Sequence, residues 1–325
     1  MASPQQLLAA LESSFVPLEE TEAFGKFLIY GASGTGKTVW AMKLAQEITP
    51  PGKDIIFIDA VEGWVSLINH PELKNRVRRT RYQGLSQIET LCQAIQAKAG
   101  SFANVGCIVC DEYSTMARND VDVVVTARAA KETEKDPDVY TFTETGASTR
   151  PMDKGTPKLL KETEKDPDVA TFTDTGASTR RMDRGTRKLL NVTADGVHLI
   201  IIAHERKDKD KSNIEVCAPS FMPAFNAIVK ESMHVVGRMS ANEGIDDKGN
   251  PVYRWSIQVH PTRQVVAKSR VGGLAVHNSP ARFISVTKAW LEGTGTTEKL
   301  DRKPVNDIIE VESADDETFG GIMEN

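Results

Sequence analysis

The decisive stretch of the chain is Gly31-Ala32-Ser33-Gly34-Thr35-Gly36-Lys37-Thr38, which fits the pattern G-x-x-x-x-G-K-[ST] without a mismatch. The apolar run before it, 27–30, is typical of a buried strand, and residues 39–48 after it are typical of a helix. Glycines let the backbone curl around a phosphate, so that successive N–H groups point at the anion with a helix N-terminus behind them. The sequence therefore predicts a strand–loop–helix unit whose loop residues bind a nucleoside triphosphate.

The last two residues of this loop carry a specific chemistry. The Lys37 ammonium is expected to reach the β- and γ-phosphates, and the Thr38 hydroxyl is expected to hold Mg²⁺. A glycine-rich turn that matched the pattern by chance would not need a strand before it and a helix after it. We therefore predict a nucleotide–magnesium site here.

The composition favours a soluble intracellular protein. A chain of 325 residues with 40% hydrophobic content can bury one large core. Its apolar runs fall short of the ~20 residues that a membrane span needs, and its start lacks the pattern of a signal peptide, so no membrane partner is expected. Cys107 and Cys110 lie three apart in one apolar run, where strand geometry turns them to opposite faces. They are expected to be buried hydrophobes rather than metal ligands.

The end of the chain is acidic. Residues 305–325 contain seven carboxylates and no Lys or Arg, so the net charge of −5 becomes +2 without them, because −5 minus −7 is +2. The tail, taken as 296–325, is expected to be disordered. Two interpretations stay open: a solvated end that aids solubility, or a mimic of nucleic acid that competes for a basic groove.

A tandem duplication interrupts the chain. Residues 131–160 recur at 161–190 with 25 of 30 positions identical. Two copies are too few for a solenoid, so the first copy is interpreted as an extra loop that a fold tolerates. The second copy runs directly into the next strand and is taken as the one in the working register. The middle of both copies is expected to be weakly ordered.

The remaining sequence alternates strands and helices. The predicted strands are 26–30, 54–59, 77–82, 105–111 and 198–204, and the predicted helices are 38–48, 85–99, 114–130 and 182–194. This is the pattern of a parallel sheet covered on both faces, the α/β class. After residue 220 the prediction changes to antiparallel strands at 234–240, 253–260 and 264–269, with a turn at 246–250 and a helix at 282–291. One domain is expected over 15–295, after an N-terminal segment 1–14.

Acidic residues follow two of the predicted strands. The apolar run 107–110 ends in Asp111-Glu112, the form of a Walker B element. Asp111 is expected to orient Mg²⁺, and Glu112 could polarise the attacking water. The run 55–58 also leads to acids, of which Glu62 is a second candidate. Acids at strand ends are also common on solvated loops, and that interpretation competes for Glu62 in particular.

Three basic or titratable side chains complete the set. His204 ends an apolar strand and is interpreted as a polar group that senses the γ-phosphate, although a lone histidine is more often structural. Lys268 and Arg270 occupy alternate positions of a predicted strand and so share one face. They are expected to approach the triphosphate of a neighbouring subunit in trans.

These motifs together resemble the RecA/KaiC/DnaB group of P-loop ATPases, and within it the phage-encoded RecA-like ATPases that assist single-strand annealing. The resemblance covers about residues 24–290 and rests on GASGTGKT, FIDAVEG, CIVCDEYSTM, IIIAHE and AKSRVGG. It implies Glu62 as catalytic base, His204 as phosphate sensor, and Lys268 and Arg270 as trans-acting cations. The chain departs from RecA in placing Glu112 beside Asp111, as many AAA-type ATPases do, so the base stays open between Glu62 and Glu112.

The resemblance also implies a function and partners. It implies a cytoplasmic, phage-type protein that uses ATP and Mg²⁺ to bind single-stranded DNA during recombination or annealing. The expected partners are further copies of the chain, in a ring or a filament, and a single-strand-binding protein. DNA would face the duplicated segment and residues 205–218, although the alternating charges of the latter weaken a phosphate track. The alternatives are a hexameric helicase-like motor or helicase loader, and a nucleotide-binding scaffold with little turnover.

Overall fold

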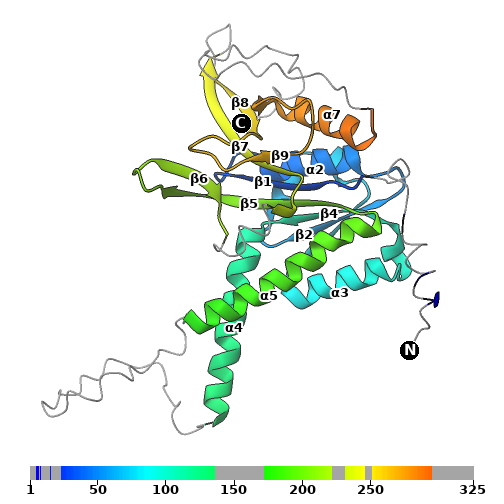
Figure 1. The fold of residues 1–325 in the computed structure, drawn as a ribbon, viewed down its shortest axis with the longest axis vertical. Helices are drawn as coiled ribbons and strands as arrows, with labels where there is room; N and C mark the ends of the chain where they lie inside the picture. The colour runs from blue at the N-terminus through cyan, green and yellow to red at the C-terminus, as the bar shows by residue number, and fades with distance from the viewer. Residues whose placement is uncertain are drawn as a thin grey trace, which may run out of the picture.

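The computed structural model describes residues 23–135, 172–221, 231–245 and 251–294, together with Gln5, Gln6, Leu8 and Phe15 (Figure 1). The expected turn at 246–250 and the acidic tail lie outside the described residues, as does most of the N-terminal segment. Within the described ranges, no helix combines the length and the apolar composition that crossing a membrane requires.

A ten-stranded sheet forms the centre of the described structure. Its strands are β1 Lys26–Gly31, β2 Asp54–Asp59, β3 Val77–Arg81, β4 Val105–Asp111, β5 His198–Lys209, β6 Glu215–Pro219, β7 Val235–Ile245, β8 Pro251–Gln258, β9 Lys268–Ser269 and β10 His277–Asn278. The helices are α2 Lys37–Ile48, α3 Leu85–Gln96, α4 Tyr113–Lys135, α5 Phe172–Asn191 and α7 Pro280–Leu291. Short 3-10 turns span η2 Gly63–Leu67, η3 Pro71–Lys74, η4 Gly100–Asn104 and η5 Val192–Asp195.

The strand order is β10-β8-β7-β1-β5-β4-β2-β3, with β6 beside β5 and β9 beside β7. The strands from β7 to β3 are parallel, whereas β8, β9 and β10 are antiparallel additions. Strand β5 therefore separates β1, which leads into the glycine-rich loop, from β4, which ends in the acids. This is the mostly parallel α/β arrangement expected from the sequence, with antiparallel strands after it.

Successive side chains of the central strands point to opposite faces of the sheet, so a hydrophobic core forms on each face. Tyr30, Ile58 and Cys110 lie in the cluster packed against α3, α4 and α5, whereas Ile29 and Cys107 lie in the cluster under α2 and α7. Figure 1 shows these two groups of helices on opposite sides of the sheet. The prediction that the two cysteines face opposite ways and are buried is confirmed. Within the described residues no group of His, Cys, Asp and Glu side chains could hold a metal by itself.

Three predicted elements differ in the structure. The segment 234–240 is antiparallel to β8 and β9, as expected, but β7 also joins the central sheet parallel to β1, with Phe27 opposite Val235. An apolar run has the same pattern in either direction, so its sequence does not encode its orientation. Strand β5 continues past His204 to Lys209 and forms a hairpin with β6 where a loop was expected. Of the predicted strand 264–269, only Lys268–Ser269 forms a strand, with a single bridge from Val265.

Helix α5 comes from the second copy of the duplication. It begins at Phe172, ten residues before the expected start at 182. Its first half is tied to α4 by Asp120, whose carboxylate is buried and accepts hydrogen bonds from Ser178 Oγ at 2.9 Å and Arg181 Nε at 3.0 Å. Residues 131–135 of the first copy end α4, and residues 136–171 lie outside the described structure.

Candidate nucleotide and magnesium site

The glycine-rich loop joins β1 to α2 at the carboxyl edge of the sheet. Gly34 and Gly36 have φ angles of 80° and 75°, a left-handed conformation that glycine adopts without strain. A Cβ on Gly31 would overlap the carbonyl oxygen of Met239, so the backbone of β7 approaches too closely for a side chain there. The Thr35 hydroxyl donates to the Ala32 carbonyl at 2.9 Å and ties the loop across its base.

Lys37 lies across the loop that precedes it. Its Nζ donates to the carbonyl oxygens of Gly31 at 3.0 Å and Ala32 at 2.7 Å, and the residue is buried. Burial lowers the pKa of Lys37, while the negative charges of Glu112 and Asp111 act in the opposite direction. The ammonium is thus held beside the backbone groups that would surround a phosphate.

Thr38 and Asp111 meet across the gap between α2 and β4. The Thr38 hydroxyl donates to Asp111 Oδ2 at 2.7 Å, and Asp111 is 2% exposed. Burial raises the pKa of Asp111 to about 6, and the neighbouring Asp59 contributes in the same direction. A dication beside this carboxylate would favour its charged form.

The space beside these two oxygen atoms is kept open by a glycine. A Cβ on Gly63 would overlap Asp111 Oδ2 and would lie 3.5 Å from Thr38 Oγ1. A hydroxyl and a carboxylate are hard oxygen donors of the kind that Mg²⁺ prefers. The residues present therefore fit Mg²⁺, with Thr38 and Asp111 as the groups that would hold it.

Asp59 positions the loop that carries this glycine. Its Oδ1 accepts the backbone N–H groups of Val61 at 3.2 Å and Gly63 at 2.9 Å, and its Oδ2 accepts Arg79 Nε at 2.9 Å. The Arg79 guanidinium also lies 5.0 Å from the centre of the Trp64 ring. Asp59 therefore holds the backbone at the edge of the site in place. Its position at the end of a strand is compatible with either this structural role or a catalytic one, so the sequence alone could not separate them.

Glu112 and His204 form a pair beside the loop. His204 Nε2 contacts Glu112 Oε2, and Thr115 Oγ1 donates to the same carboxylate oxygen at 3.3 Å. Glu112 is 2% exposed, and its Oε1 has no hydrogen-bond partner among the described residues. Burial raises the pKa of Glu112 to about 7, against the lowering effect of Lys37.

The position of His204 is fixed by the sheet and by α4. It lies opposite Gly31 in the parallel register of β1 and β5, and its backbone N–H donates to Ser114 Oγ at 3.1 Å. Burial lowers the pKa of its imidazole, and the positive charges of Lys37 and Arg118 lower it further. The side chain expected to sense a phosphate is therefore next to both the loop and Glu112.

Of the other predicted residues, Glu62 lies at the edge of the site, and Lys268 and Arg270 lie away from it. Glu62 is exposed, with a φ of 58°, just before Gly63. Lys268 and Arg270 both donate to the carbonyl of Glu231, at 2.8 Å and 3.2 Å. Arg270 lies level with the amino end of β1, roughly 16 Å along the strand from the loop. These two cations therefore belong to the opposite edge of the sheet, and their supply to a neighbouring subunit stays a prediction.

Sequence reasoning missed Thr115 and Arg118. Thr115 follows Glu112 by three residues on α4, a helical spacing that brings side chains together and that was a usable signal. The same reasoning missed Trp255 and Met239, which approach Gly36 from β8 and β7. Their contact depends on strand pairing far along the chain, which no local pattern shows.

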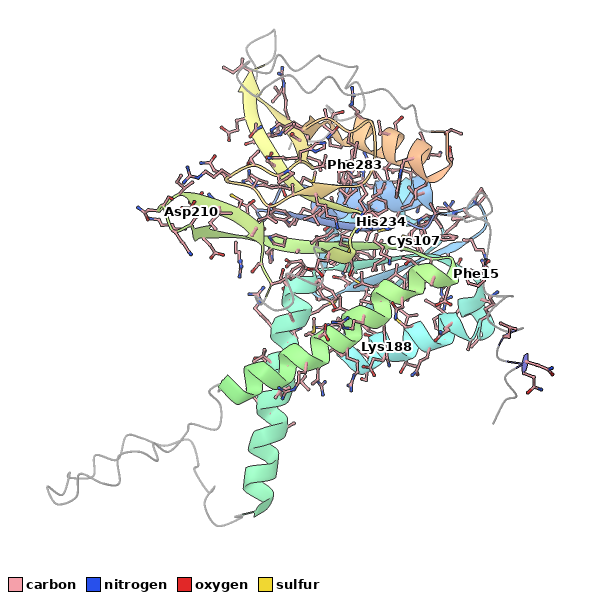
Figure 2. All side chains as sticks on the ribbon, in the orientation of Figure 1. Phe15, Cys107, Lys188, Asp210, His234 and Phe283 are labelled. Atoms are coloured by element: carbon pink, nitrogen blue, oxygen red, sulfur yellow. The ribbon has the colours of Figure 1, made fainter. Side chains whose placement is uncertain are left out.

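The β5–β6 hairpin, expected to face DNA, carries balanced charge. Arg206 pairs with Asp208 at 3.0 Å and Lys207 pairs with Glu215 at 2.9 Å. Figure 2 shows Asp210 at the tip of this hairpin, away from the central sheet. Pairing within the hairpin leaves little net field for a phosphate backbone.

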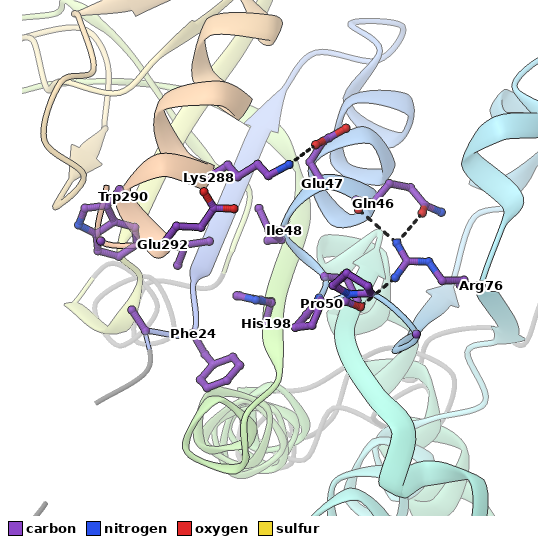
Figure 3. A pocket seen from close by; sticks show the side chains of 16 residues that line it. Phe24, Gln46, Glu47, Ile48, Pro50, Arg76, His198, Lys288, Trp290 and Glu292 are labelled. Carbon is purple, nitrogen blue, oxygen red and sulfur yellow. Dashed lines mark hydrogen bonds and ion pairs between the residues drawn. The ribbon is translucent and has the colours of Figure 1, made fainter. Parts of the chain in front are cut away.

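A pocket of about 930 Å³ lies at the opposite edge of the sheet (Figure 3). Three of its charged groups are engaged by the fold: Lys288 pairs with Glu47 at 2.9 Å, and Arg76 donates to carbonyl oxygens that include that of Pro50. His198 at its wall accepts the backbone N–H of Gly25. None of the predicted site residues lines this pocket, so its volume does not identify the chemistry.

The fold and the loop together show an α/β protein whose phosphate-loop motif joins the first parallel strand to a helix. No protein-family model and no curated protein matches the sequence. Among solved structures, the chain is similar to the flagellar accessory protein FlaH from Methanocaldococcus jannaschii, with 12% identity, a TM-score of 0.34, and coverage of 78% of this chain and 85% of that chain. At this level of likeness no activity can be transferred, so the site has to be interpreted from its own geometry.

Proposed function

We propose that the protein binds ATP with Mg²⁺ and hydrolyses it. The observation that carries the proposal is the Thr38–Asp111 hydrogen bond directly beside the buried carboxylate of Glu112. The loop N–H groups and Lys37 would hold the phosphates, and Thr38 and Asp111 would hold the metal. Bound Mg²⁺ would neutralise charge on the phosphates during transfer.

Within this site, Glu112 is proposed as the general base rather than Glu62. Glu112 Oε1 is a buried acceptor without a partner among the described residues, so its capacity to accept a hydrogen bond from the attacking water is unused. Glu62 is exposed, and water competes for every hydrogen bond that it makes. His204, which contacts Glu112 and lies opposite Gly31, would couple the base to the state of the γ-phosphate.

The wider role is proposed from the family resemblance of the sequence motifs. In this role the ATPase acts on single-stranded DNA in recombination or annealing, as a ring or filament in which Lys268 and Arg270 reach a neighbour. The separation of these cations from their own loop is compatible with action in trans. The balanced charge of the β5–β6 hairpin gives no independent support for DNA binding.

The test measures phosphate release with and without single-stranded DNA, on samples whose assembly state is followed by light scattering. The proposal predicts Mg²⁺-dependent release that DNA stimulates, and annealing of complementary strands without unwinding of a duplex. Strand displacement would favour a helicase-like motor instead. Tight ATP binding without phosphate release would refute hydrolysis.

A further inference from the structure

The first turns of α4 present three polar side chains to the site. Ser114 Oγ accepts the backbone N–H of His204, which anchors the helix to β5. Thr115 Oγ1 lies 3.3 Å from Glu112 Oε2, and Arg118 Nη2 lies 3.0 Å from Thr115 Oγ1. The three residues follow one helical face, so a single element reaches both Glu112 and His204.

The hydrogen-bond capacities of these groups determine which atom donates. A guanidinium only donates, whereas a hydroxyl has one hydrogen and can also accept. Because Arg118 donates to Thr115 Oγ1, the threonine hydrogen is left for another acceptor, and Glu112 Oε2 is within reach. Arg118 therefore orients the Thr115 hydroxyl towards the carboxylate.

This arrangement treats the two oxygens of Glu112 differently. Oε2 receives Thr115 Oγ1 and contacts His204 Nε2, whereas Oε1 has no partner among the described residues. Fixing Oε2 fixes the direction of Oε1 as well, since the carboxylate is planar. The oxygen that is free to accept a proton is thus held in one orientation.

The geometry points to Thr115 as a positioning residue for Glu112, with Arg118 as the residue that locks the Thr115 hydroxyl. This inference rests on the proposed hydrolysis, and it deepens it by naming what aims the base. Thr115 touches neither the phosphates nor the water in this role. It acts through Glu112, so its loss should slow turnover without weakening the binding of ATP.

The experiment compares kcat and KM for ATP in Thr115→Val and Thr115→Ser. Valine keeps the shape but removes the hydroxyl, and kcat should fall about tenfold with KM unchanged. Serine keeps the hydroxyl and should restore most of kcat. The matched control is Thr126→Val, because Thr126 Oγ1 donates to the Asp122 carbonyl on the same helix and is exposed. Its kcat should equal that of the wild type.

Arg118→Leu tests whether Arg118 orients the Thr115 hydroxyl. Its kcat should fall by about threefold, and the Arg118→Leu/Thr115→Val double variant should be no slower than Thr115→Val alone, because both changes remove the same hydrogen bond to Glu112. A Thr115→Val variant with wild-type kcat would overturn the inference, as would a Thr115→Ser variant as slow as valine or an equal loss in Thr126→Val. A wild-type protein that binds ATP but releases no phosphate would refute the proposed function itself, and the positioning role with it.

Discussion

Substitution of Gly63 by alanine is a sharp test of the metal site, because the one methyl group that it adds would press directly on the Asp111 carboxylate. The new Cβ would overlap Asp111 Oδ2 and lie 3.0 Å from Asp111 Cγ, where ordinary contacts begin at 3.4 Å. The carboxylate must therefore retreat by at least 0.4 Å, the difference between these two distances. Such a shift would also disturb the hydrogen bond between Thr38 Oγ1 and Asp111 Oδ2, which now measures 2.7 Å.

Mg²⁺ tolerates such a displacement poorly, since it requires near-ideal octahedral geometry with ligands at about 2.0–2.1 Å. Disturbing the shell around a metal site typically costs about 10–100-fold in metal affinity. That range corresponds to about 1.4–2.7 kcal/mol. We expect the Mg²⁺ concentration for half-maximal phosphate release to rise by this factor in Gly63→Ala, at saturating ATP.

The matched control is Gly272→Ala, because a Cβ there meets no atom within 4 Å and the backbone is not in the left-handed region. Its Mg²⁺ dependence should equal that of the wild type. A Gly63→Ala protein with the wild-type thermal midpoint and the wild-type Mg²⁺ dependence would refute the reasoning. In that case Asp111 would not be a metal ligand.

Three further predictions concern other parts of the molecule. Arg270→Ala should still bind ATP, while phosphate release falls about a hundredfold; full activity would exclude an arginine finger in trans. Burial lowers the pKa of His198 to about 4, below its usual value, so acid favours the unfolded state, in which the histidine is protonated more readily. The contribution of His198 leaves the free energy of unfolding unchanged above about pH 6.5 and reduces it by up to about 3 kcal/mol as the pH falls to 4. In urea titrations, His198→Asn should lose less stability on acidification, since it keeps an acceptor without titrating; an equal loss would contradict this. Deletion of 131–160 should leave the thermal midpoint nearly unchanged, because 161–165 repeats the end of α4. Deletion of 161–190 instead places prolines at two positions of α5 and should destabilise by about 3 kcal/mol or more; equal midpoints for the two deletions would contradict this account.

Most of the central sheet could be predicted from the sequence. The bounds of β2 and β4 match the prediction because each is a continuous apolar run, buried on both faces, that stops at an acid. The loop 31–38 could also be predicted, since its backbone needs the positive φ angles that glycine adopts at positions 34 and 36. Each of these features depends on the residues of its own segment, so the sequence of that segment predicts it.

The remaining differences depend on contacts between distant segments. The orientation of β7 and the extension of β5 are set by the strands beside them. The first half of α5 is tied to α4 by the buried Asp120, 58 residues before Ser178. For the same reason, the sequence left the base open between Glu62 and Glu112: their burial differs, and burial depends on the whole fold.

The most direct test of the account compares Glu112→Gln with Glu62→Gln in single-turnover phosphate release, with ATP affinity measured on the same proteins. We predict that both variants bind ATP like the wild type. Glu112→Gln should lose at least about a hundredfold in the rate of hydrolysis, because an amide cannot accept the proton, whereas Glu62→Gln should keep the wild-type rate. Normal hydrolysis in Glu112→Gln, with hydrolysis lost in Glu62→Gln, would contradict the account.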